Sequence, residues 1–205
     1  MSSRFFIYYG ALCGGWAAFV GFLAGMLVAP ENPLGRAGIL GMFFGLTVSF
    51  TLGCVDAVGR VTPRQAGAVV LQGLAAAPVG ALAGLLAGIL GQLLSQVAGL
   101  LQVLAWSLAG AMIGTSVCVF EFLDGAIRQI ESKRARRNLV KRLVGGTLGG
   151  LLGGLFAVFL TSLVTRALRD RDPNWLWSPR AMAFVALGMC IGLFVSLAHV
   201  FMKDE

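Results

Sequence analysis

The sequence predicts an all-α integral membrane protein with six transmembrane helices, arranged as three parallel two-helix Gly-rich repeats in a pseudo-threefold bundle. Three observations predict this class: low charge, long apolar runs and recurring glycines. Of the 205 residues, 58% are hydrophobic and only 12% are charged, whereas soluble domains are about a quarter charged. So few charged residues cannot cover a water-soluble globule of this size, and we therefore expect the bilayer to be the solvent.

Six apolar runs are long enough to cross a hydrocarbon core of about 30 Å at roughly 1.5 Å per residue. The first run is longer than the roughly 7 to 15 apolar residues of a signal peptide, so we expect an uncleaved helix. The breaks between runs are Pro30 with Pro33, Pro63, the polar QLLSQ stretch from Gln92, the basic run from Arg128, and Pro173 with Pro179. The expected spans are 5–28, 38–58, 66–92, 102–126, 143–165 and 181–202.

We expect a single membrane domain over 1–205, with repeats at 5–58, 66–126 and 143–202 and a basic cytoplasmic loop at 127–142. Lys and Arg concentrate on the cytoplasmic side of membrane proteins. With both termini on that side, most of the 16 Lys and Arg residues lie there, and those left outside are Arg36, Arg166, Arg169, Arg171 and Arg180. The expected location is therefore the cell (inner) membrane, multi-pass, with the N-in and C-in orientation.

Glycines recur at matching places in these spans. The even-numbered spans each carry a GxxxG motif, formed by Gly41 and Gly45, Gly110 and Gly114, and Gly188 and Gly192. The odd-numbered spans carry Gly10 and Gly14, then Gly80, Gly84 and Gly88, then Gly145, Gly149 and Gly153. Because each repeat has two spans, all three repeats share one orientation about an axis along the membrane normal.

The fifth span begins with residues 143–156, which read LVGGTLGGLLGGLF. A phosphate-binding glycine loop would follow a strand with its own spacing, including GK[ST] in a P-loop, and neither feature is present. Small residues instead let membrane helices approach closely, since lipid tails provide no hydrophobic drive for helix association. We therefore interpret these glycines and the GxxxG motifs as helix-packing positions, and the doubled pairs allow one helix to pack on two neighbours.

This order of Gly-rich odd spans and GxxxG-bearing even spans resembles poorly characterised bacterial multi-spanning membrane domains that are sometimes associated with forkhead-associated (FHA) modules. Residues 145–155, 110–114 and 188–192 carry the resemblance, which extends over most of the chain. It implies a bacterial multi-pass membrane domain. It implies no activity and no functional residues, and the sequence itself contains no FHA module.

Four ionisable residues lie inside the expected spans, all on even-numbered ones: Asp56, Glu121, Asp124 and His199. Ionisable residues in a span are expensive and are functional candidates for that reason. Glu121 and His199 each follow the second glycine of a GxxxG motif by the same number of residues, and Leu52 has this place in the first repeat. They are a candidate intramembrane polar pair, and the alternative is that Glu121 pairs with Arg128 near the interface.

The segment 127–142 is strongly basic, with Lys133, Arg134, Arg136, Arg137, Lys141 and Arg142 close together. Beside a membrane such residues attract anionic lipid headgroups by ~1 kcal/mol each, and they could also contact an acidic partner. A topogenic role explains the segment equally well. The formal charge of +7 does not indicate nucleic-acid binding, because the basic residues lie mostly between apolar runs.

No catalytic residues, metal ligands or cofactors are predicted. The four cysteines lie in apolar runs without CxxC spacing, and the one histidine belongs to no His/Asp/Ser spacing and no HExxH motif. We expect a non-enzymatic protein, either a membrane-embedded scaffold or a subunit of a larger complex with other membrane subunits or copies of itself. The alternative is an ion channel or small-solute transporter with a pathway along the repeat axis. The even spans offer few polar residues for such a pathway, which favours the scaffold.

Overall fold

The computed structural model describes residues 3–58, 66–97, 101, 103–113, 116, 132–167 and 179–203. The described part of the chain is helical apart from short connections, which confirms the all-α class. Its helices are α1 (Ser3–Val28), α2 (Pro33–Val58), α3 (Ala66–Val97), α5 (Ser132–Ala167), α6 (Pro179–Lys203) and a shorter helix, Val103–Ile113, which we call helix 103–113. The last part of the expected fourth span lies outside the described residues.

Four stretches among the described residues are long and apolar enough to cross a membrane: Phe5–Val28, Pro33–Val55, Val69–Gln96 and Arg180–Leu197. Helix 103–113 and the Leu143–Phe156 part of α5 are apolar over shorter lengths. Large apolar side chains point outward on the odd-numbered helices, for example Trp16 at 63% exposure, Leu82 at 63% and Phe159 at 58%. Water-soluble monomers rarely expose apolar surface on this scale, so these are the features of a membrane-embedded protein.

The connection between α1 and α2 is short. α2 begins at Pro33, earlier than expected. The side-chain oxygen of Asn32 accepts a hydrogen bond from the Leu34 N–H at 3.1 Å, and its carbonyl accepts one from the Arg36 N–H at 2.8 Å. Asn32 is therefore the N-cap, and Pro33 is the first helical residue, a position that needs no N–H donor. The expected start at residue 38 was wrong, because the hydropathy pattern marks the apolar core of the helix rather than its cap.

Two other expected boundaries were also wrong. α3 continues through the QLLSQ stretch to Val97, and the Ser95 hydroxyl donates to the Gln92 carbonyl at 2.8 Å within that helix. α5 begins at Ser132, so residues 132–142 of the expected loop are helical. Gln, Lys, Arg and Leu are all good helix formers. A polar or basic stretch ends an apolar run without ending the helix.

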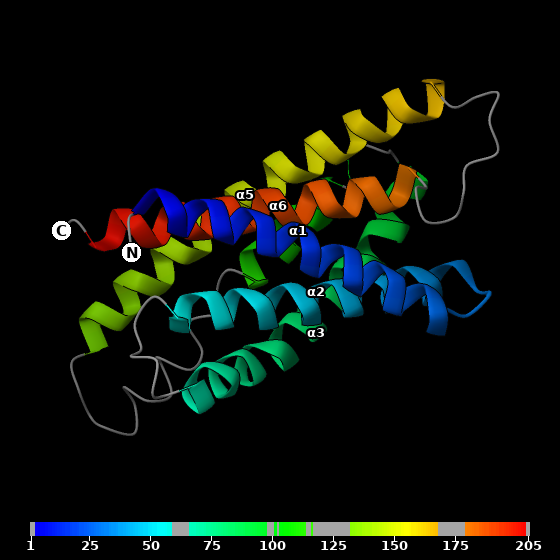
Figure 1. Cartoon of the computed structure of the whole chain (residues 1–205). Coiled ribbons are helices and arrows are strands. Elements are labelled where there is room, and N and C mark those ends of the chain that lie inside the picture. Colours follow the sequence, from blue (N-terminus) through cyan, green and yellow to red (C-terminus); the bar gives the residue numbers. More distant parts are fainter. Residues whose placement is uncertain are drawn as a thin grey trace.

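The helices pack in neighbouring pairs. α2 lies against α3, α1 lies against both α6 and α2, and α5 lies against α6 (Figure 1). The start of α1, the end of α6 and the start of α5 all lie at the same end of the bundle (Figure 1). The two described chain ends and the basic stretch at 132–142 therefore share one end.

Candidate functional site

The contact between α2 and α3 is made by glycine backbones on both helices. Gly45 lies against Gly80, and Gly41 lies against Gly84. A Cβ atom at Gly45 would overlap the Gly80 carbonyl oxygen, and one at Gly84 would overlap the Gly41 carbonyl oxygen. The two backbones thus approach more closely than any larger residue at these places would allow.

The same kind of contact occurs twice more in the described residues. Between α1 and α6, Gly10 lies against Gly192 and Gly14 against Gly188. Between helix 103–113 and α5, Gly110 lies against the backbones of Gly146 and Gly150. Gly114, the other predicted packing position of that GxxxG motif, lies outside the described residues.

The doubled glycines of α5 face two different neighbours. Gly150 and Gly154 lie against Trp106 of helix 103–113, whereas Gly149 and Gly153 lie against Cys190 of α6. Gly145 is buried. Gly146 and Gly150, which we call the 146/150 ridge, are therefore the residues of α5 that correspond to Gly10 and Gly14. The sequence comparison predicted Gly145 and Gly149, one residue earlier. Gly149 and Gly153 pack against α6 instead.

Apolar side chains fill the centre of the bundle. Phe44, Ile113 and Ile191 are each 0% exposed, and each directly precedes the second glycine of a GxxxG motif. Val48 and Val195, one turn further along α2 and α6, join the same core cluster. The Phe184 ring meets Phe44 and Trp106 at ring-centroid distances of 5.3 and 5.5 Å, both edge to face. Over the described residues, the centre of the bundle is closely packed.

One polar contact crosses this core. Ser116 Oγ lies 3.0 Å from Ser49 Oγ and 2.7 Å from the Ile113 carbonyl oxygen, and both hydroxyls are buried. A hydroxyl has one proton and can accept as well. When Ser116 donates to the Ile113 carbonyl, Ser49 donates to Ser116, and both groups are satisfied. This contact joins α2 to the residue that lies three positions beyond the end of helix 103–113.

The predicted polar pair cannot be assembled from the described residues. Glu121 lies outside them, and His199 lies on α6 with its side chain outside them. Leu52, the corresponding residue of the first repeat, is 3% exposed and belongs to the central core. The predicted lipid or partner contacts, Lys133, Arg134, Arg136, Arg137, Lys141 and Arg142, are on α5 with side chains outside the description. Both sites remain predictions.

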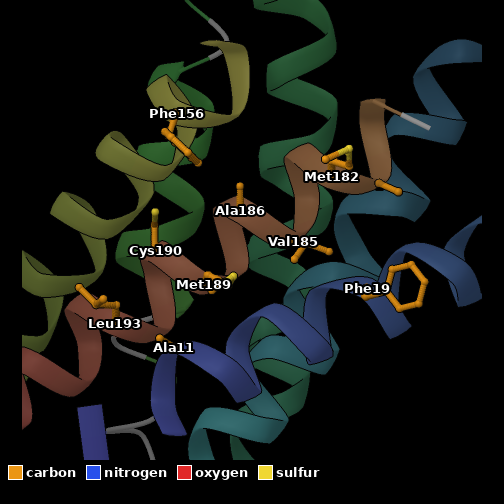
Figure 2. A pocket seen from close by; sticks show the side chains of 10 residues that line it. Ala11, Phe19, Phe156, Met182, Val185, Ala186, Met189, Cys190 and Leu193 are labelled. Carbon is orange, nitrogen blue, oxygen red and sulfur yellow. The ribbon is translucent and has the colours of Figure 1, made fainter. Parts of the chain in front are cut away.

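An apolar groove of about 430 Å³ lies over the outer face of α6, between α1 and α5 (Figure 2). Ala186 and Cys190 of α6 form part of its floor, with Phe19 of α1 and Phe156 of α5 on its two sides. The other lining residues are Ala11, Ala181, Met182, Val185, Met189 and Leu193. This groove was not predicted from the sequence. A signal existed: aligned on the GxxxG motifs, α2 has Ile39 and Phe43 where α6 has the smaller Ala186 and Cys190.

Apolar outer faces, glycine contacts between helices and an apolar centre are together the features of an α-helical membrane protein. No known protein family matches the chain, and no curated protein or solved structure is significantly similar to it. Its function has to be inferred from its own residues.

Proposed function

We propose that the chain is a non-enzymatic integral membrane protein that serves as a membrane-embedded scaffold or as a subunit of a larger membrane complex. The packing of the bundle centre is the observation that carries this proposal. Phe44, Ile113 and Ile191 meet there with no exposed surface. A bundle filled in this way has its apolar outer faces as its main surfaces for contact within the membrane.

We further propose six spans in three hairpins around a pseudo-threefold axis. The three glycine contacts support this arrangement, because each joins the even-numbered helix of one hairpin to the odd-numbered helix of the next: α2 to α3, helix 103–113 to α5, and α6 to α1. A second correspondence agrees with it. Ser49 lies over Gly80, and Ser196, its counterpart in the third repeat, lies over Gly10.

For the setting, we propose the inner membrane of a bacterial cell with both termini on the cytoplasmic side. The shared end of α1, α6 and the basic start of α5 supports this orientation (Figure 1), since positive residues concentrate on the cytoplasmic side. The resemblance to bacterial multi-spanning domains adds the cell type. The basic segment would contact anionic lipid headgroups there.

The alternative, a channel or small-solute transporter, requires a hydrated path. Central side chains of the described residues leave little polar surface along the axis, apart from the mutually bonded Ser49 and Ser116. A pathway would therefore have to open by separating helices whose glycine backbones are in contact. Glu121 and His199 are the residues that such a pathway would use.

Extraction of the tagged full chain from native membranes in a mild detergent tests the scaffold. After chemical crosslinking, native mass spectrometry should find it with another membrane subunit or with further copies, and an unrelated tagged membrane protein from the same cells controls for carry-over. A chain recovered only as a monomer would contradict the proposal. Ion or solute flux into liposomes that Glu121→Gln and His199→Ala abolish would favour the transporter instead.

A further inference from the structure

We propose that the groove over α6 holds one acyl chain of a bilayer phospholipid, and that Arg180, which precedes the lining residues on α6, contacts the headgroup phosphate. The inference rests on the membrane-embedded placement of the chain, but not on its role as a scaffold. It follows from the chemistry of the groove lining, from its width and from the arginine that precedes the lining residues on α6.

The groove lining is suited to hydrocarbon. Its seven α6 residues are spaced so that they share one helix face, and all ten lining side chains are apolar or thiol-bearing. The two methionines, Met182 and Met189, are unbranched and polarisable, so they adapt to an irregular ligand surface. Such a lining gives a headgroup nothing to bind, whereas an acyl chain gains dispersion contacts with the groove walls, because a tail that already lies in hydrocarbon has no hydrophobic drive to gain.

The width of the groove decides between a lipid chain and a partner helix. From Ala181 to Leu193 the groove follows α6 for about 18 Å at the usual helical rise. The volume of about 430 Å³ is the space open to the centre of a water-sized sphere, so with a radius of about 1.4 Å added on each side the slot is roughly 8 Å across over that length. A helix with its side chains is about 10–12 Å wide and does not enter such a slot. Carbon atoms in contact lie about 3.5–4.0 Å apart, so a single methylene chain fits.

An exposed arginine precedes the first groove-lining residue of α6. Arg180 is the second residue of α6 and immediately precedes the lining residues Ala181 and Met182, and its side chain is exposed. The apolar span on α6 also begins at Arg180, which places this residue at the level where headgroups lie. A guanidinium presents a planar fork of donors that suits a phosphate. A phospholipid therefore matches both parts of the site, tail and headgroup.

α2 cannot form a similar groove, because its side chains are larger at the positions that correspond to the groove floor. In the shared register, Ile39 and Phe43 of α2 replace Ala186 and Cys190, and α1 packs closely on this part of α2, with Gly25 next to Leu40 and Phe43. The small residues of α6 thus leave open a space that larger ones would fill. Filling it by substitution is the direct way to test its occupant.

The test uses the full chain in vesicles of phosphatidylcholine and phosphatidylglycerol in equal parts, with a trace of phosphatidylglycerol carrying a photoactivatable acyl chain. After irradiation, labelled peptides are identified by mass spectrometry. Labelling of residues 181–193 and of Phe156 should exceed that of the Leu82 face of α3 several-fold. Ala186→Phe should reduce it to the level of that face, and Leu82→Phe, on an exposed face away from the groove, should leave groove labelling unchanged.

Arg180→Gln provides a second variant that does not alter packing. It should weaken groove labelling by the phosphatidylglycerol probe several-fold, and leave labelling by a photoactivatable diacylglycerol, which has no phosphate, unchanged. The proposal would be overturned if labelling of each residue followed its exposure alone, or if Ala186→Phe left labelling of the groove unchanged. So would a crosslink in native membranes that places a partner's helix in the groove. If the groove is labelled but the chain is recovered without partners, only the proposal of a scaffold is refuted.

Discussion

The α2–α3 contact and the α5–α6 contact both depend on glycine, but in different ways. In the first, glycines face glycines: Gly41 and Gly45 meet Gly84 and Gly80, and carbonyl groups occupy the space of the missing side chains. In the second, the glycines are on α5 only, and Gly149 and Gly153 face larger residues of α6. In the first contact an added Cβ would overlap a carbonyl oxygen, whereas at Gly149 it would lie 3.0 to 3.1 Å from its nearest neighbours, which include backbone atoms of Ile191 and Cys190.

A single helix, α5, makes both kinds of contact, one with each of two neighbours. On α5, the 146/150 ridge makes the glycine-to-glycine contact with Gly110, while Gly149 and Gly153 lie against non-glycine residues of α6. Two ridges displaced by one residue face different directions on a helix. The doubled glycines therefore provide both kinds of contact in the same turns, and the two kinds should differ in their tolerance of an added methyl group.

The largest effect is expected at the glycine-to-glycine contact. In Gly45→Ala the new Cβ would overlap the Gly80 carbonyl oxygen and lie 3.0 Å from the Gly84 Cα. Because only a helix shift relieves this overlap, the free energy of folding should worsen by at least the upper end of the roughly 1–3 kcal/mol typical of overpacking. Size-exclusion chromatography of heated, detergent-solubilised protein should show loss of the monodisperse peak. An unchanged midpoint would mean that α2 and α3 are not held at this distance.

A smaller effect is expected at the contact between α5 and α6. A Cβ at Gly149 would lie 3.0 Å from the Ile191 Cα and 3.1 Å from the Phe194 Cβ. These contacts are tight but without the overlap at Gly45, so Gly149→Ala should cost about 1–2 kcal/mol. Gly149→Leu, which no small adjustment accommodates, should prevent stable expression. Normal yield of the leucine variant would contradict the close approach of these two helices.

The buried serine pair should contribute less again. Ser49→Ala and Ser116→Ala each remove one partner of the 3.0 Å contact. Side-chain hydrogen bonds inside membrane proteins are worth about 0.6 kcal/mol on average in double-mutant cycles. The coupling energy between the two substitutions, measured from unfolding of both single variants and the double variant in mixed micelles, should have about that size. Additive effects would show that the two hydroxyls do not interact.

The sequence predicted the helical class and the approximate place of each described helix, because apolar length depends on composition alone. It did not predict which helices share the glycine contacts. Gly45 could have paired within its own hairpin, and only the three-dimensional path of the chain brings it to Gly80. The start of α5 was missed because Ser132–Arg142 has no helix breaker and hydropathy does not register a basic helix. The groove depends on side chains that are small relative to their surroundings, and no single stretch of sequence contains those surroundings.

The smallest effect is expected at a glycine that has no neighbour among the described residues, and it serves as the control for all the others. Gly67 lies in the first turn of α3 and is exposed. A Cβ atom added there would have no neighbouring heavy atom within 4 Å among the described residues. Gly67→Ala adds the same methyl group as Gly45→Ala to the same pair of helices. Without a clash, only helix propensity acts, and near a helix end this should remain within roughly 0.5 kcal/mol, as for other surface substitutions. If both variants lost the same stability by the same assay, the penalty at Gly45 would belong to glycine itself and not to the contact between the helices.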